Sequence, residues 1–205
     1  RGCARGGGPA GLSIPSVGLT GGIGAGKSEA LAALERLGAA TLSTDAVVHE
    51  LLTGPELRDQ LVERWGDEVA PGGTVDRAAI ARIVFDRPEE REWLQGALWP
   101  RVGARVAEWR TELDSLSPPP RAAVVEVPLL FESGMEGVFD LTVAVAAEED
   151  IRAQRAGARG HEGVEGRTSA QLSQEEKSQR ADFTIRNDGT LQELEEKLSE
   201  LLDSL

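Results

Sequence analysis

The sequence predicts an α/β fold with a doubly wound parallel sheet of five strands. Three observations support this prediction: short apolar segments rich in β-branched residues recur along the chain, helical patterns separate them, and a glycine-rich turn follows the first of them. At 205 residues, the chain is long enough to bury one sizeable core. The expected strands are residues 16–20, 39–43, 122–127, 141–145 and 182–186.

The first expected strand leads directly into a phosphate-binding motif. Gly21, Gly26, Lys27 and Ser28 fit the pattern G-x-x-x-x-G-K-[ST], in which backbone N–H groups and the N-terminus of the next helix hold a polyphosphate. In this motif, Lys27 reaches the β- and γ-phosphates and the Ser28 hydroxyl ligates Mg²⁺. A flexible glycine turn is the competing interpretation, but the strand before the motif and the helical pattern after it favour a phosphate site. The residues expected around the nucleotide are Gly22, Gly24, Ala25, Gly26, Lys27, Ser28 and Glu29.

The second expected strand is followed by the longest stretch without a strand. Residues 45–116 carry apolar residues at helical spacing and lead into a proline run, so we predict an α-helical insertion over residues 46–117. The insertion belongs to a single expected domain of residues 16–205, which also has a short lid at 150–180. Residues 1–15 lack the apolar run of a secretory signal and are expected to form a disordered leader without function.

Two acidic residues follow expected strands, at the edge where doubly wound sheets bind their ligands. Asp45 opens a helical pattern, and its simplest interpretation is a residue of the helix N-terminus, as Ser43 and Thr44 are also good caps. Beside a phosphate-binding loop, the Asp45 carboxylate could instead accept the proton of an attacking hydroxyl. Glu126 is a lone charge in an apolar run and needs a partner, for which we favour a water on Mg²⁺.

A basic stretch follows the fourth expected strand. It contains Arg152, Arg155, Arg159 and Arg167, with Lys177 and Arg180 shortly after. An ordinary solvated helix face, paired with the acidic residues 148–150, would explain the stretch equally well on residue pattern alone. The phosphate motif favours a lid in which arginines stabilise the charge of the transferred group.

Composition narrows the possible partners. The net charge of −13 argues against nonspecific binding of nucleic acid, which requires a broad basic surface. No apolar stretch reaches the length of a membrane span, and the single cysteine, Cys3, cannot form an internal disulfide. We therefore expect a cytoplasmic protein without nucleic-acid or membrane partners. A monomer or a weak homo-oligomer is our expectation for its oligomeric state, which composition does not determine.

Other classes of phosphate-loop protein fit less well. A GTPase would carry the guanine motif N-K-x-D, for which "RNDG" has the wrong residues, and a motor or helicase would have paired acidic residues where Glu126 is followed by Val127. A kinase for a nucleoside monophosphate or another small hydroxyl acceptor remains an alternative, as does an ATP-binding regulator without catalytic activity. The residue pattern alone does not separate these alternatives.

Further motifs give the chain a specific resemblance from about residue 16 to its end. The segment GLTGGIGAGKS (18–28), Asp45, PLLFE (128–132), residues 155–159, RTSAQ (167–171) and residues 176–189 with the pattern E-K-x-x-x-A-D-x-x-I-x-N-x-G resemble the motifs of the dephospho-CoA kinases. These enzymes transfer a phosphoryl group from ATP to the ribose 3′-hydroxyl of dephospho-CoA. The resemblance implies a fold of the P-loop kinase type and ATP and dephospho-CoA as substrates, with Mg²⁺ as a cofactor, in the last step of coenzyme A biosynthesis.

The resemblance also implies roles for residues. Asp45 would be the general base, Lys27 and Ser28 would bind ATP and Mg²⁺, and Arg155 and Arg159 would act from the lid. Arg159 and Asn187 would be among the nucleotide-binding residues.

Some positions depart from the family pattern, mostly in the predicted insertion at 46–117, which by this resemblance would hold the acceptor. Ser43 stands for the first aspartate of D-A-D, His49 for an arginine, and Trp99 and Gly103 for the histidine and arginine of H-P-x-V-R. Trp65 stands for a phenylalanine before Gly66, and we interpret it as core packing. Trp99 could stack on the acceptor's adenine or pack in the core.

Overall fold

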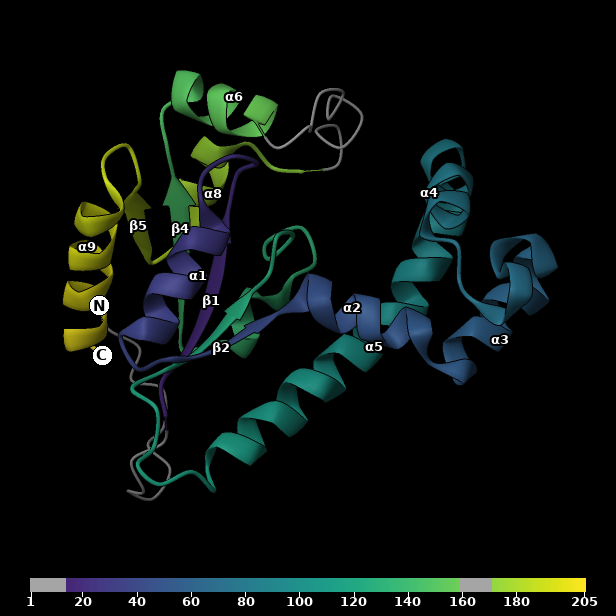
Figure 1. Ribbon diagram of the computed structural model, residues 1–205, viewed down its shortest axis with the longest axis horizontal. Coiled ribbons are helices and arrows are strands. Elements are labelled where there is room, and N and C mark those ends of the chain that lie inside the picture. The colour runs from purple at the N-terminus through teal and green to yellow at the C-terminus, as the bar shows by residue number, and fades with distance from the viewer. Residues whose placement is uncertain (1–13, 159–170) are drawn as a thin grey trace, which may run out of the picture. The chain divides into compact units, whose positions relative to one another are not determined.

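Five strands form one sheet, which confirms the predicted α/β class (Figure 1). The computed structural model describes residues 14–158 and 171–205. Each strand begins and ends within one residue of its expected boundary: β1 (Ser16–Gly21), β2 (Ala40–Ser43), β3 (Ala123–Glu126), β4 (Leu141–Ala146) and β5 (Phe183–Arg186). The expected leader falls almost entirely outside the described residues.

The strand order explains where a ligand can bind. The order is β2-β3-β1-β4-β5, and β1 pairs in parallel with both β3 and β4, while β4 pairs in parallel with β5. Later strands therefore lie on both sides of β1. In doubly wound sheets the crevice for ligands forms at the carboxyl ends of the strands where the connections diverge. The carboxyl end of β1 is the start of the glycine-rich loop.

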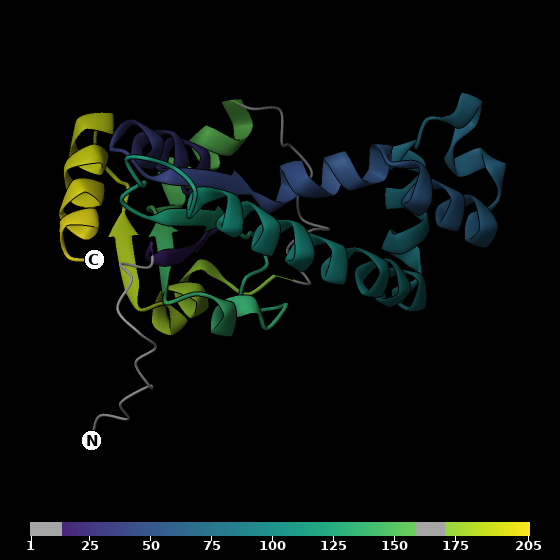
Figure 2. The same ribbon diagram turned by 90° about the horizontal axis from the view of Figure 1, so that it is seen from below.

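Helices cover both faces of this sheet (Figure 2). On one face, α1 (Lys27–Arg36) packs against α9 (Leu191–Asp203), and on the other α8 (Gln174–Arg180) packs against β1 and β4. A short 3-10 helix, η3 (Met135–Val138), lies between β3 and β4 in the chain, and α6 (Glu149–Ala158) follows β4. Side chains from β1, α1 and α9 meet in the main apolar core, which includes Leu19, Leu34, Val124, Val143 and Leu198.

The chain divides into two compact units, and the sheet belongs to the first except for the last two residues of β2. The first unit comprises Arg1–Thr41 and Arg110–Leu205, and the second is Leu42–Trp109. The second unit is helical, as predicted for the insertion, and contains α2 (Thr44–Thr53), α3 (Pro55–Trp65), η1 (Asp67–Val69), η2 (Pro71–Gly73), α4 (Arg77–Asp86) and most of α5 (Pro88–Leu113). Its apolar cluster contains Leu52, Leu57, Leu61, Val69, Ile80 and Leu98.

Three tryptophans of the second unit pack around this cluster. Trp65 is partly buried, its indole N–H donates to Glu90 Oε2 at 2.8 Å, and its ring meets that of Trp93 edge to face at 5.2 Å between centroids. These contacts agree with the interpretation of Trp65 as core packing. Trp99 is also partly buried against the cluster, so most of its surface is already used in packing. Among the described residues, no helix has both the length and the apolar composition needed to cross a membrane.

A polar contact aligns the beginnings of β1 and β4. The carboxylate Oδ2 of Asp140 accepts the backbone N–H of Ser16 at 2.8 Å and its hydroxyl at 2.6 Å. Partial burial on its own would raise the pKa of Asp140. The two hydrogen bonds from Ser16, together with the nearby charge of Arg110, outweigh that effect and hold the pKa below its ordinary value.

This contact predicts a loss of stability in acid. Because the pKa of Asp140 is lower in the folded protein than in the unfolded chain, its contribution is complete above the unfolded value of about 4 and is lost as the pH falls through the folded value. We expect Asp140→Asn to melt below the wild type at pH 6 and the difference to shrink toward pH 3. Thermal melts at pH 3 to 6 would check this, and a gap independent of pH would contradict it.

Candidate functional site

The glycine-rich loop joins β1 to α1 and has the backbone of an anion site. Gly24 (φ +76°) and Gly26 (φ +93°) lie in the left-handed region, which glycine adopts without steric cost. Gly26 is the N-cap of α1, where no side chain makes a capping hydrogen bond. A helix N-terminus of this kind presents backbone N–H groups and a partial positive charge to a bound phosphate. The predicted loop is therefore present between the predicted strand and helix.

Asn187 holds the loop from the opposite end of the sequence. It follows β5, is only 4% exposed, and donates from Nδ2 to the carbonyl of Ala25 at 2.9 Å. Its backbone N–H donates to Ala146 O at 2.7 Å, which fixes it beside the end of β4. The amide also occupies the space that a Cβ at Gly26 would need. Asn187 thus contacts the loop backbone, and the structure brings it together with Ala25 and Gly26.

Arg152 lies against the other side of the loop. Its Nε donates to Ile23 O at 2.9 Å, and its guanidinium lies where a Cβ on Gly22 would contact it at 3.3 Å. Its backbone carbonyl comes so close to Gly24 that a Cβ there would be 2.5 Å away. Sequence reasoning placed Arg152 in the basic stretch and missed this role, because nothing in the stretch distinguishes it from its neighbours.

Two other basic residues of the stretch, Arg155 and Lys177, contact segments outside the loop. Arg155 is partly buried and donates from Nη1 to Asn187 O at 3.0 Å, which links the expected lid to the residue that holds the loop. Arg159 and Arg167 lie outside the described residues. Lys177 differs from a lid residue, because it is 1% exposed and forms an ion pair with Glu132.

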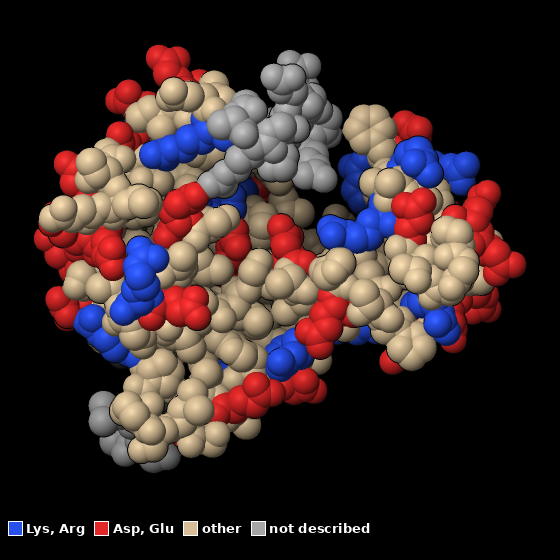
Figure 3. All heavy atoms as spheres, in the orientation of Figure 1, with Lys and Arg blue, Asp and Glu red and all other residues tan. Residues whose placement is uncertain are grey.

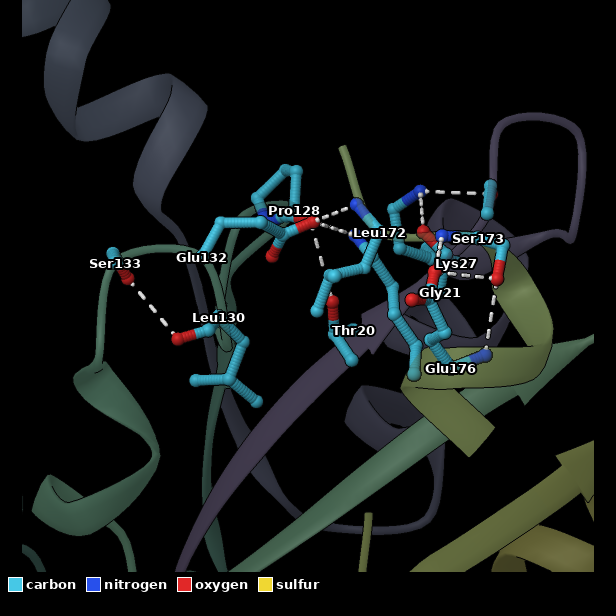
Figure 4. A network of polar contacts seen from close by, with 12 residues as sticks. Thr20, Gly21, Lys27, Pro128, Leu130, Glu132, Ser133, Leu172, Ser173 and Glu176 are labelled. Carbon is cyan, nitrogen blue, oxygen red and sulfur yellow. Dashed lines mark hydrogen bonds and ion pairs between the residues drawn. The ribbon is translucent and has the colours of Figure 1, made fainter. Parts of the chain in front are cut away.

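Lys27 folds back on its own loop. Its Nζ donates to the carbonyls of Gly21 and Gly22, both at 3.1 Å, as drawn for Gly21 in Figure 4. Ser28 and Glu29 follow in the first turn of α1, Ser28 exposed and Glu29 partly buried. Gly22 is buried. An ammonium held at the mouth of the loop in this way can exchange carbonyl oxygens for phosphate oxygens.

The carboxylate predicted as general base, Asp45, and the one predicted to bind Mg²⁺ through water, Glu126, lie in different units. Glu126 ends β3 beside Leu19 of β1 and is partly buried. Asp45 is exposed in the first turn of α2, in the second unit. The N-cap position belongs to Ser43, whose side chain makes no capping hydrogen bond, so Asp45 is not the cap of this helix.

The donor set fits Mg²⁺ better than a metal bound by protein alone. The described part of the chain has no group of three or more His, Cys, Asp and Glu side chains able to hold a metal ion. Mg²⁺ commonly takes one or two protein oxygens and completes its shell with water and substrate phosphates. The Ser28 hydroxyl and the Glu126 carboxylate are ligands of the required kind.

The surface charge agrees with the composition. On the face seen in Figure 3, Asp and Glu side chains are spread over the surface, and Lys and Arg side chains occur in small separate groups. A site for triphosphate must then concentrate positive charge locally, from Lys27, Arg152, Arg155 and the N-terminus of α1.

Comparison with known proteins decides the family. A model of the dephospho-CoA kinase family matches residues 15–193. The dephospho-CoA kinases of Thermus thermophilus and Deinococcus radiodurans are 37% and 38% identical to this chain, each over 192 residues that cover 92% of it and 91% of the relative. The chain belongs to the dephospho-CoA kinase family. A crystal structure of a Thermus thermophilus protein, 36% identical, superposes with a TM-score of 0.78 and covers 94% of this chain and 98% of the other.

His49, which stands where the family has an arginine, lies beside another arginine in the structure. His49, on α2, lies 3.3 Å from the guanidinium of Arg77 at the start of α4, measured from Nδ1 to Nη1. Both residues are exposed in the second unit. A guanidinium is therefore present beside His49. Arg101, also in this unit, pairs with Glu56 at 2.7 Å.

The close contact at Gly24 predicts that this member of the family requires glycine there. Gly24→Ala should destabilise the protein by clearly more than the roughly 1–2 kcal/mol of a left-handed alanine, because the new Cβ would also meet the Arg152 carbonyl. Gly38→Ala is the matched control, since Gly38 also has a positive φ (+92°) but a Cβ there would have its nearest contact at 3.6 Å. Urea unfolding of both variants would check this, and equal losses would contradict it.

Proposed function

We propose that this chain transfers the γ-phosphoryl group of ATP to the 3′-hydroxyl of dephospho-CoA, forming coenzyme A in the last step of its biosynthesis. The observation that carries the proposal is the match to the dephospho-CoA kinase family over nearly all of the chain, phosphate-binding loop included. The geometry of that loop supports a polyphosphate ligand, because an uncapped helix N-terminus and Lys27 meet there.

The proposed roles follow from where charge develops. Lys27 would leave the carbonyls of Gly21 and Gly22 and bind the β- and γ-phosphates, stabilising the charge that moves toward the leaving oxygen. Arg155 would contribute a guanidinium to the transferred group from a lid over residues 150–180, together with Arg159. Asn187 supports the same loop by fixing the Ala25 carbonyl.

Metal binding and proton transfer complete the proposal. Ser28 would ligate Mg²⁺ directly and Glu126 through water, and the ion would supply positive charge that offsets part of the charge of the phosphates. Asp45 would take the proton of the 3′-hydroxyl as that oxygen attacks phosphorus. Its exposed position, without a role as helix cap, leaves its carboxylate accessible to a substrate. We further propose a cytoplasmic enzyme that acts as a monomer or weak homo-oligomer.

An acceptor panel tests the function. With ATP and Mg²⁺, the purified protein should form ADP in proportion to added dephospho-CoA and should not use AMP, CMP, dTMP or shikimate. Mass spectrometry should find the new phosphate on the 3′-oxygen. Faster turnover of another hydroxyl compound would assign a different acceptor to the same kinase, and ATP binding without any acceptor-dependent ADP would indicate a regulator.

A separate substitution tests the general base. Asp45→Asn keeps the shape of the side chain but cannot accept the proton, so kcat should fall about 10²- to 10⁴-fold with little change in the Kd for ATP. Glu50→Gln, another exposed position on α2, is the matched control and should keep the wild-type kcat. A wild-type kcat in Asp45→Asn would remove Asp45 from the mechanism.

A further inference from the structure

Lys177 is the largest fully buried side chain in the described part of the chain. Its Nζ donates to the carbonyl of Pro128 at 2.5 Å and pairs with Glu132 Oε1 at 3.0 Å. Burying an ammonium costs several kcal/mol unless hydrogen bonds and an opposite charge compensate it. Both partners belong to the segment after β3, so the ion pair ties α8 to that segment.

The same atoms reach two further segments. The Pro128 carbonyl also accepts the hydroxyl of Thr20 at 3.4 Å, and Thr20 is the residue before the glycine-rich loop (Figure 4). Glu132 Oε1 also accepts the backbone N–H of Leu172 at 2.8 Å, just before α8. The end of β1, the segment after β3 and the start of α8 therefore meet at one ion pair.

Helix α8 also contacts the segment between β4 and α6, through Gln174. The side chain of Gln174 donates to Ala147 O at 2.9 Å and accepts Ala147 N–H at 3.0 Å. Ala147 follows β4 and lies just before α6, the helix from which Arg152 contacts the loop. A displacement of α8 would thus disturb the loop both from Thr20 and from Arg152.

The pair is poorly explained by stability alone. Apolar residues of similar volume often replace a buried ion pair without loss of stability. In addition, Glu132 Oε2 is buried without a hydrogen-bond partner among the described residues, and such a carboxylate oxygen is costly to bury. The pair also makes hydrogen bonds to the backbone of Pro128 and Leu172, which fix the position of α8. An apolar pair could not make these directional contacts.

We propose that Glu132 and Lys177 are positioning residues, whose ion pair fixes α8 and thereby the phosphate-binding loop and Arg152. They act through the backbone and contact neither ATP nor the acceptor. The consequence for turnover rests on the proposed kinase function, whereas the consequence for the order of the loop does not.

Three variants test the proposal. Lys177→Met leaves the Glu132 carboxylate buried without its cation and should lower Tm by roughly 10 °C. Adding Glu132→Leu removes that charge as well and should recover most of the Tm. In this double variant kcat should still be about 10- to 100-fold below the wild type, since small misplacements of reacting groups have effects of this size. Glu132→Gln keeps an oxygen for Leu172 and Lys177 but leaves the buried ammonium without its counter-charge, so the variant should fold with a lower Tm and a several-fold lower kcat.

Amide hydrogen exchange over residues 18–30 without substrates gives a readout independent of the reaction. Exchange should be faster than in the wild type in the double variant and in Glu132→Gln. The matched control replaces the exposed pair Arg36–Glu195 (3.4 Å) by glutamines and should change neither kcat nor exchange.

The outcomes separate the two hypotheses. A double variant with recovered Tm and wild-type kcat and exchange would show the pair to be structural only. If the double variant does not fold, wild-type kcat and exchange in Glu132→Gln overturn the proposal. If the wild type itself does not phosphorylate dephospho-CoA, the proposed function fails, and the exchange data still decide whether the pair positions the loop.

Discussion

The site depends on how a loop almost without side chains is kept in one conformation. Gly22, Gly24 and Gly26 can approach a phosphate closely, but glycines lose more conformational entropy on ordering than other residues. The order must come from outside the loop. Asn187 supplies it through the bond from its buried amide to Ala25 O, and Arg152 supplies it from the other side at Ile23 O.

These supports all come from the carboxyl edge of the sheet. Asn187 follows β5, Arg152 is carried by the helix after β4, and the Lys177–Glu132 pair joins α8 to the segment after β3. Each is a polar group that burial makes expensive to leave unpaired, so each holds its partner in one arrangement. A phosphate site with this backing would change little in shape when ATP binds, which lowers the cost of binding.

The second unit is stabilised by a different kind of interaction. Its stability comes from an apolar cluster bordered by three tryptophans, and its polar contacts are mostly at the surface, such as the Arg64–Glu90 pair. The hydrogen bonds from Arg64 and Trp65 hold the pKa of Glu90 below its ordinary value. The departures from the family pattern, His49 and Trp99 among them, lie in this unit.

The sequence alone determined the five strands, the phosphate-binding loop and the helical character of most of residues 45–116. Local spacing predicts each of them: β-branched runs, G-x-x-x-x-G-K-S, and apolar residues every three or four positions. Only the tertiary structure decided which residues support the loop. Asn187 and Ala25 are 162 positions apart, and Arg152 and Ile23 are 129 apart. It likewise decided that Lys177 is a buried ion-pair partner rather than part of a solvated lid. Such contacts depend on strand order and on the packing of α6 and α8, which no local pattern records.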